Sequence, residues 1–321
     1  MQTHDVSALF PSQAPQPLPA TALAYLDRER ILAVQGSDAT RFLQGQLTCD
    51  VAALAVGSST LGARCNPKGR MQSSFRLLKR SEEEYLLAMA AELLEPQQQD
   101  LARYAAFFKV TLQDVSDQWL RFGLWGDQAE AALAATALGD GHALPVAAGT
   151  HELWLPLDQA DSPLASLTSQ ATAVPASVWD LQMIRLGIGQ VRGETRESFI
   201  PQMLNLQHLG GVSFHKGCYT GQEIVARMQY LGKLKRRMYR LRWDGDQLPL
   251  PGTTIHDNST GQAVGEVVMA ARAEAHLEVL AVLQNEAAEL PTLVIDNIIE
   301  PSLQSATLPY EQQMAAEPAA E

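Results

Sequence analysis

The stretch Phe-His-Lys-Gly-Cys-Tyr-Thr-Gly-Gln-Glu-Ile-Val-Ala-Arg, residues 214–227, concentrates more chemically demanding side chains than any other part of the chain. Thr220 and Glu223 have the spacing of a helix capping box, and apolar residues follow at helical intervals. Gly232 then provides a helix stop signal. The pattern predicts a helix over residues 221–231, with Thr220 as its N-cap.

This helix would place Cys218 two residues before a helix N-terminus, where free N–H groups and the helix dipole favour an anion. Lys216 and Arg227 add positive charge if the turn folds towards them, which favours the reactive thiolate. Gly217 and Gly221 permit a tight turn or the close approach of a ligand. The alternative is a buried structural cysteine beside an ordinary capped helix. The density of demanding residues favours a functional site.

Residues 216–223, K-G-C-Y-T-G-Q-E, resemble the signature of the YgfZ family of folate-binding proteins. That family includes mitochondrial iron–sulfur maturation factors and is related to the T-protein, the aminomethyltransferase of the glycine cleavage system. The preceding residues 199–214 are similar to the same family, and weaker similarity covers about 23–300. The resemblance implies an α+β, T-protein-like multidomain fold, with interleaved α/β units around a central cavity and a C-terminal antiparallel β-barrel.

The resemblance also implies a function. It indicates a protein that binds tetrahydrofolate or a one-carbon derivative and supports iron–sulfur cluster assembly or repair. Its expected partners are iron–sulfur assembly proteins and [4Fe–4S] client enzymes, such as those that add methylthio groups to tRNA. No certain metal site is expected, but Cys218 is a candidate transient ligand of a cluster; one cysteine cannot hold a cluster alone, so a partner or second copy would share it. We expect Cys218, Lys216 and Tyr219 to carry the chemistry. The residues expected to contact the cofactor are Trp179, Asn66, Lys68, Gly217, Gly221, Gln222, Glu223 and Arg227.

Two of these assignments compete with simpler structural interpretations. In the family, the loop at 65–70 faces the folate cavity, so that Asn66 can bind a pterin and Lys68 or Arg70 a carboxylate. The alternative is a hairpin turn with solvated basic residues. Trp179 lies on a helix predicted over 177–186 with Ser177 as N-cap, where it either packs in the core or stacks on a pterin ring.

One position departs from the T-protein pattern. T-proteins usually have an acidic residue where this chain has Gly187, and a carboxylate is a natural partner for the N–H donors of a pterin. Glu194 is a candidate substitute. The departure weakens the alternative function, a folate-dependent aminomethyl transferase, which needs a carboxylate or base near the folate. A third function, cysteine-nucleophile hydrolysis with His215 or His208 as base, requires neighbours that sequence does not supply.

Composition indicates a globular, reducing-compartment protein. Hydrophobic residues make up 46% of 321 residues, and no apolar run approaches the ~20 residues that span a bilayer. The three cysteines form no C-x-x-C pair and no zinc pattern. Since the first twenty residues lack a basic segment followed by an apolar one, we expect no secretory signal and a cytoplasmic location.

The net charge of −12 argues against nucleic-acid binding over the whole surface. Residues 227–242 nevertheless contain seven Lys and Arg and no acid. This basic segment is interpreted equally well as a solvated strand edge or as an anion port for a folate glutamate tail or RNA. Direct RNA binding is not expected, because no RNA-binding motif accompanies the segment and aromatic residues are only 6% of the chain.

Local patterns give an approximate order of elements. Strands alternating with single helices predict α+β units, and short strands with turns after residue 238 predict a small barrel. The predicted domains are a mobile arm (1–20), an N-terminal α+β domain (21–115), a second, interleaved α+β domain with the motif (116–235), the barrel (236–305) and a tail (306–321). The predicted strands are 31–34, 60–65, 71–78, 85–89, 109–112, 119–126, 152–155, 238–243, 253–255, 264–268, 277–283 and 292–295; the other predicted helices begin at Ser37 and span 92–106, 128–138 and 160–170.

Overall fold

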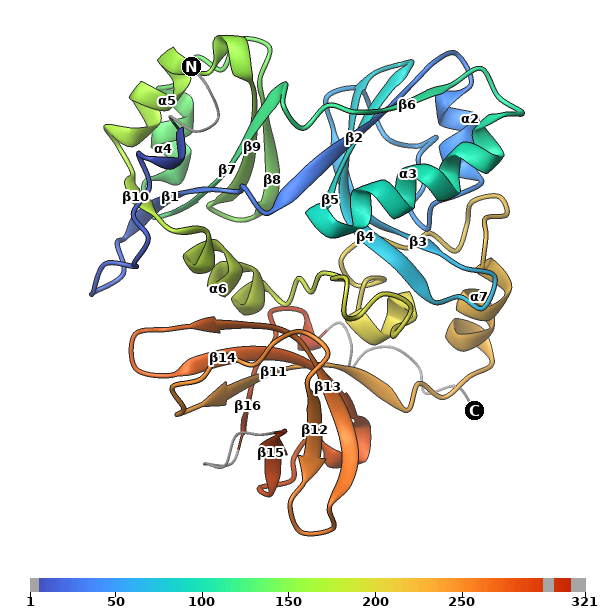
Figure 1. The fold of residues 1–321 in the computed structure, drawn as a ribbon, viewed down its shortest axis with the longest axis vertical. Helices are drawn as coiled ribbons and strands as arrows, with labels where there is room; N and C mark the ends of the chain where they lie inside the picture. The colour runs from blue at the N-terminus through green and yellow to red at the C-terminus, as the bar shows by residue number, and fades with distance from the viewer. Residues whose placement is uncertain (1–5, 297–302, 313–321) are drawn as a thin grey trace.

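The computed structural model describes residues 6–296 and 303–312. Figure 1 shows two N-terminal sheets side by side above a C-terminal sheet, with helix α6 (Ala176–Leu186) between them. Helix α6 packs against strands of the second and third sheets, so its faces are covered from both sides. It begins after Pro175, and no side chain caps it, so the prediction that Ser177 is the N-cap was wrong. Proline suits this position because its fixed φ already matches the chain entering a helix.

The first sheet has the strand order β3-β4-β5-β2-β6 and is antiparallel. Its hairpins follow the alternation in the sequence, and the predicted strands 31–34, 60–65, 71–78 and 85–89 and the turn at 66–69 are confirmed. The last strand begins at Thr111, two residues later than predicted, and the first helix has Asp38 rather than Ser37 as its N-cap. Two helices cover one face with apolar side chains such as Phe42 and Leu101. The elements are β2 (Glu29–Gln35), α2 (Ala39–Gln44), β3 (Ser59–Cys65), β4 (Met71–Ser81), β5 (Glu84–Ala90), α3 (Ala91–Ala105) and β6 (Thr111–Asp114).

The second sheet has the order β10-β1-β7-β9-β8, with β1 parallel to β10 and antiparallel to β7. Strand β1 comes before every strand of the first sheet in the chain, but it pairs within the second sheet. The first predicted domain therefore contributes this strand to the second. Helix α4 is shorter than the predicted 128–138. The elements are β1 (Thr21–Tyr25), β7 (Trp119–Gly126), α4 (Ala129–Ala134), β8 (His142–Ala147), β9 (Thr150–Pro156), η1 (Leu157–Gln159), α5 (Asp161–Thr168) and β10 (Thr172–Val174).

The third sheet is a curled half-barrel, not the closed barrel that was predicted. Its order is β15-β12-β13-β14-β11-β16, and among the described residues its two edge strands do not pair. One backbone hydrogen bond, from Leu303 N to Leu293 O (3.3 Å), links the two edges. The elements are β11 (Arg236–Trp243), β12 (Thr254–Asp257), β13 (Gln262–Arg272), β14 (Leu277–Gln284), η3 (Asn285–Ala287), β15 (Leu293–Ile295) and β16 (Gln304–Ala306).

Both predicted free ends are packed where the structure describes them. Val6 is fully buried, and Phe10 stacks on Phe122 with ring centroids 5.8 Å apart, so this part of the predicted mobile arm belongs to the second sheet's core. In the predicted tail, Leu308 and Tyr310 are buried in the central core. The Tyr310 hydroxyl donates to Gly187 O at 2.7 Å. Residues 1–5 of the arm and 313–321 of the tail lie outside the described part of the chain.

Candidate functional site

The motif loop runs beside the segment that follows α2. Thr48 makes two of the contacts, since its Oγ1 donates to Gly211 O at 2.6 Å and its carbonyl accepts from Ser213 N at 2.9 Å. The Lys216 ammonium donates to Leu47 O and Cys49 O at 2.7 and 2.8 Å. These bonds join the second predicted domain to the first before the motif helix begins.

Lys216 and Tyr219 are more buried than Cys218, and the side chain of each is engaged within the protein. The Lys216 ammonium lies 5.1 Å from the centroid of the Tyr219 ring. Burial lowers the pKa of Lys216 to about 8, although nearby Cys49 and Asp50 favour its charge. The Tyr219 hydroxyl is buried without a partner in the described chain, and burial, with smaller contributions from Cys65 and Cys49, raises its pKa.

Helix α7 (Gln222–Tyr230) starts at Gly221, not at Thr220, and no side chain caps it. The predicted capping box is therefore wrong. Gly221 has a φ of 86°, and a Cβ there would lie 2.5 Å from Asn66 O. A left-handed glycine this close to another backbone is required for the motif helix to dock on the β3–β4 turn. Gln222 is half-buried at the first helical position, whereas Glu223 and Arg227 are exposed.

Cys218 is exposed, whereas Cys49 and Cys65 are buried, and burial raises the pKa of each buried thiol to about 12. A Cβ added at Gly217 would meet nothing within 4 Å, so this glycine is also at an open surface. The alternative interpretation, a buried structural cysteine, does not hold for Cys218. Cys218 lies three residues before Gly221, the N-cap of α7, rather than the predicted two residues before the N-cap, and it is accessible to another molecule.

The β3–β4 turn meets the motif at Gly221, and the Asn66 side chain closes the turn through its Oδ1. Asn66 Oδ1 accepts from the backbone N–H groups of Lys68 and Arg70 at 2.9 and 3.1 Å, which closes the turn. Lys68 is exposed, and the Arg70 guanidinium donates to Ser198 O. The side chain of Asn66 thus has a structural role here.

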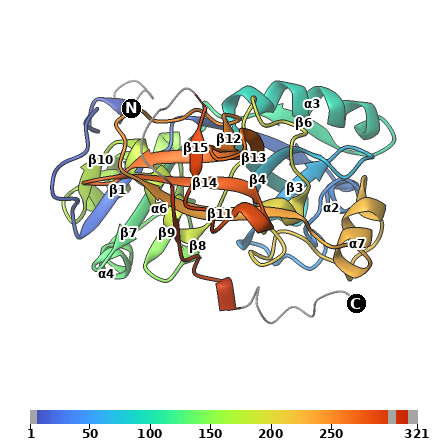
Figure 2. The same cartoon turned by 90° about the horizontal axis from the view of Figure 1, so that it is seen from below.

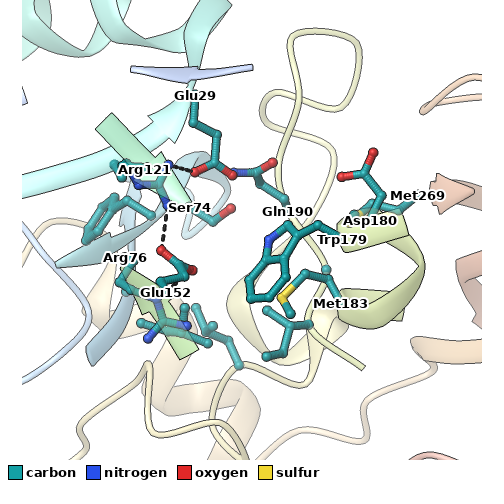
Figure 3. A pocket seen from close by; sticks show the side chains of 17 residues that line it. Glu29, Ser74, Arg76, Arg121, Glu152, Trp179, Asp180, Met183, Gln190 and Met269 are labelled. Carbon is teal, nitrogen blue, oxygen red and sulfur yellow. Dashed lines mark hydrogen bonds and ion pairs between the residues drawn. The ribbon is translucent and has the colours of Figure 1, made fainter. Parts of the chain in front are cut away.

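A separate cavity lies where the three sheets meet, and Trp179 forms one wall (Figure 3). The empty space between its lining side chains is about 580 Å³, a figure that includes open solvent at the mouth. The Trp179 indole is 5% exposed and lies 5.5 Å from the Trp125 ring. A Cβ at Gly123 would come within 2.2 Å of this indole, so glycine is required there to seat the ring.

The wall opposite Trp179 is charged (Figure 3). The buried Arg121 guanidinium pairs with Glu29 and with Glu152, the latter at 2.5 Å, and Arg76 Nε lies 2.8 Å from the other Glu152 oxygen. Gln190 Nε2 donates to Glu29 Oε1 at 2.8 Å. Burial alone would raise the pKa of Glu152, but the two guanidiniums outweigh it and lower the pKa to about 2.

A further carboxylate lines the cavity, but it comes from neither Gly187 nor Glu194, the two positions considered from the sequence. Asp180 lines it beside Trp179 and pairs with Arg28 at 2.8 Å; burial raises its pKa despite that partner. Glu194 lines a neighbouring outer pocket rather than this cavity. Gly187 has a φ of 69°, and the Tyr310 hydroxyl would lie 2.6 Å from a Cβ there, so an acidic residue at that position would strain the backbone and require Tyr310 to move.

The structure thus divides the predicted site residues into two groups. The motif residues, Asn66 and Lys68 meet at one edge, and Trp179 lies in the central cavity, whose lining includes none of the others. Sequence reasoning missed Glu29, Arg121, Glu152, Asp180 and Gln190. A signal was present: Arg121 and Glu152 interrupt otherwise apolar strands, and such charges are buried only when paired.

Comparisons with known proteins identify the family. Residues 23–145 match the family model of the GCVT N-terminal domain. The chain is 38% identical over 249 residues to the "tRNA-modifying protein YgfZ" of Photobacterium profundum, covering 74% of this chain and 75% of that protein. The chain belongs to the YgfZ family. A family protein from Aliivibrio fischeri is 34% identical over 298 residues, 88% of this chain and 92% of that protein.

The fold resembles a T-protein. The glycine cleavage system aminomethyltransferase T of Bartonella henselae superposes with a TM-score of 0.69 over 93% of this chain and 87% of that one, at 17% sequence identity. At this identity the likeness concerns the fold alone. Among the described residues, none of the helices combines the length and apolar character needed to cross a membrane.

Proposed function

We propose that this protein binds a reduced folate in the central cavity and acts as an accessory factor in iron–sulfur cluster assembly or repair, including the maintenance of tRNA-modifying [4Fe–4S] enzymes. The observation that carries the proposal is the buried indole of Trp179 opposite a fixed set of polar groups. A flat heterocycle needs an apolar wall for its face and donors and acceptors for its edge, and this cavity has both.

The residues present fit a pterin. The Arg121 Nε is a buried donor without an acceptor in the described chain, which suits a ring carbonyl oxygen. The carboxylates of Glu29 and Asp180 accept N–H bonds, and the Gln190 amide holds Glu29 in place. A folate supplies a carrier for one-carbon units, and the contribution of these side chains is to bind, orient and desolvate it.

The iron–sulfur part of the proposal rests on Cys218. Within the described residues no group of three or more His, Cys, Asp or Glu side chains is arranged to hold a metal ion. A cluster resident on this chain alone is therefore not proposed. The exposed thiol instead offers one ligand to a cluster that a partner protein also holds.

A folate-dependent aminomethyl transferase is the second candidate. Gly187 argued against it from sequence, but Asp180 supplies a cavity carboxylate whose pKa is raised by burial, as suits a general base. Turnover of a protein-bound aminomethyl donor with tetrahydrofolate tests this function. Loss of turnover in Asp180→Asn, with folate affinity retained, would favour the transferase.

A titration with reduced folates tests the main proposal. Tetrahydrofolate and 5-formyltetrahydrofolate should change the tryptophan fluorescence of the parent protein. Trp179→Phe should remove most of this change. It should also weaken binding about tenfold, because a favourable ring contact is lost. Trp243→Phe, in the third sheet's own core, is the matched control and should leave the titration intact. Equal titration curves for the parent and Trp179→Phe contradict the pocket.

A further inference from the structure

The end of α7 and its connection to β11 form a surface ridge, defined here as Arg227, Tyr230, Leu231, Lys233 and Lys235. All five are exposed, with Tyr230 at 59% and Leu231 at 81%. Figures 1 and 2 both place α7 at the outer edge of the molecule. Large apolar side chains gathered on an exposed surface mark a binding site more often than isolated ones do.

The cations of the ridge are available for a ligand. Within the described part of the chain, Arg227, Lys233 and Lys235 form no ion pair with a carboxylate. By contrast, Arg240, further along the same basic segment, pairs with the buried Glu278 at 2.6 Å. The basic segment thus has a structural part on β11 and an unengaged part on the ridge.

The ridge is also held in place by the third sheet and the motif loop. Asn285 Nδ2 donates to Leu234 O at 2.7 Å, and Asn285 N donates to Lys235 O at 2.9 Å. Phe214 meets Tyr230 edge to face, with ring centroids 5.9 Å apart and an interplanar angle of 71°. Because the backbone and the tyrosine are already fixed, a ligand binds here at a smaller entropic cost.

We propose that this ridge binds a single-stranded segment of RNA, with phosphates on Arg227, Lys233 and Lys235 and a base stacked on Tyr230. Unpaired cations beside an exposed aromatic ring are the combination that single strands require. A duplex is disfavoured, since it needs a longer cationic footprint and the chain as a whole carries −12.

This inference revises the expectation drawn from composition. Aromatic residues are sparse over the whole chain, but Tyr230 lies within the basic segment and is 59% exposed. The inference goes beyond the proposed function and is independent of the folate cavity, because none of the ridge residues lines that cavity.

Fluorescence anisotropy with a labelled RNA stem–loop and a fully paired RNA of equal length tests the proposal. The parent should prefer the stem–loop. Lys233→Glu with Lys235→Glu should weaken stem–loop binding at least tenfold and reduce the salt slope by about 0.7 for each phosphate that is no longer neutralised. Tyr230→Ala should weaken it about tenfold, and Tyr230→Phe should keep most of the affinity.

The matched control is Arg103→Glu with Arg272→Glu, which makes the same change in net charge on α3 and β13, and it should change affinity less than threefold. Equal losses in the control and the ridge variant, or no loss in the ridge variant, overturn the proposal. Tighter binding of an acidic peptide than of RNA would also overturn it and assign the ridge to a protein partner. Folate titrations on the same variants should match the parent, so a failure of the cavity and a failure of the ridge are distinguishable.

Discussion

The central cavity and the motif surface differ in how they are built. In the cavity, charged side chains such as Arg121 and Glu152 are buried and paired, and they come from strands far apart in the chain. At the motif surface, neighbouring residues are fixed by backbone contacts, and Cys218 is left exposed. A cavity of this kind can enclose a small ligand, whereas an exposed thiol is open to solvent and to other molecules. The sequence motif with the most chemically reactive residues therefore lies at the surface, and it gave no indication of the central cavity.

The largest expected effect concerns the buried charges of the cavity. Arg121→Ala leaves Glu29 and Glu152 without their shared partner, and should lower the free energy of unfolding by about 3–5 kcal/mol. Urea denaturation measures the change. Arg30→Ala, which removes an exposed pair with Asp114, is the control and should cost under about 1 kcal/mol. Similar losses for the two variants would show that the cavity network is no more important than a surface pair.

Lowering the pH should weaken the same network of buried charges in the cavity and so destabilise the fold. The pKa of Glu152 is about 2 in the folded protein, below its ordinary 4.5, so its contribution to stability is complete above the unfolded value and is lost as the pH falls towards 2. The difference corresponds to roughly 3 kcal/mol. Denaturation midpoints between pH 6 and pH 2.5 should decline less in Glu152→Gln than in the parent. Parallel declines would remove Glu152 from the acid response.

Alanine should destabilise the protein at one glycine of the motif, which is tightly packed, and not at the other, which lies at an open surface. Gly221→Ala forces a side chain into a left-handed backbone against Asn66 O, and should cost about 2 kcal/mol. Gly217→Ala meets open space and should change stability by less than about 0.5 kcal/mol. Thermal unfolding of both variants checks this difference. The docking of α7 on the β3–β4 turn would be in doubt if the two alanines behaved alike.

The smallest effect on the fold is expected at the thiol itself. Cys218→Ala should change the free energy of unfolding by less than about 0.5 kcal/mol, because the side chain is exposed. Under the proposed function, the same variant keeps its folate affinity but no longer supports [4Fe–4S] enzymes in cells. Cys49→Ala, at a buried position, is the contrast and should destabilise the fold. Full support of cluster enzymes by Cys218→Ala would remove the thiol from the mechanism.

Local sequence patterns located most of the regular elements. The hairpin around residues 66–69, helix α3 and strands β11 to β15 of the third sheet followed from turn residues and apolar periodicity, because these depend on near neighbours, whereas β16 was missed. The errors came where distant parts of the chain decide the outcome. Gly221 replaced Thr220 as the N-cap because the β3–β4 turn approaches it, and Leu308 and Tyr310 were buried by a core that no local pattern reveals.

The sequence by itself determined the family, through the eight residues from Lys216 to Glu223, and the order of strands and helices that follows from local periodicity. Only the tertiary structure decided that Trp179 faces Arg121 and Glu29 across a cavity while Cys218 stands apart at the surface. The physical reason is that pairing buried charges and seating an indole against Gly123 depend on contacts between residues that are distant in the chain. Spacing along a chain carries no information about such contacts.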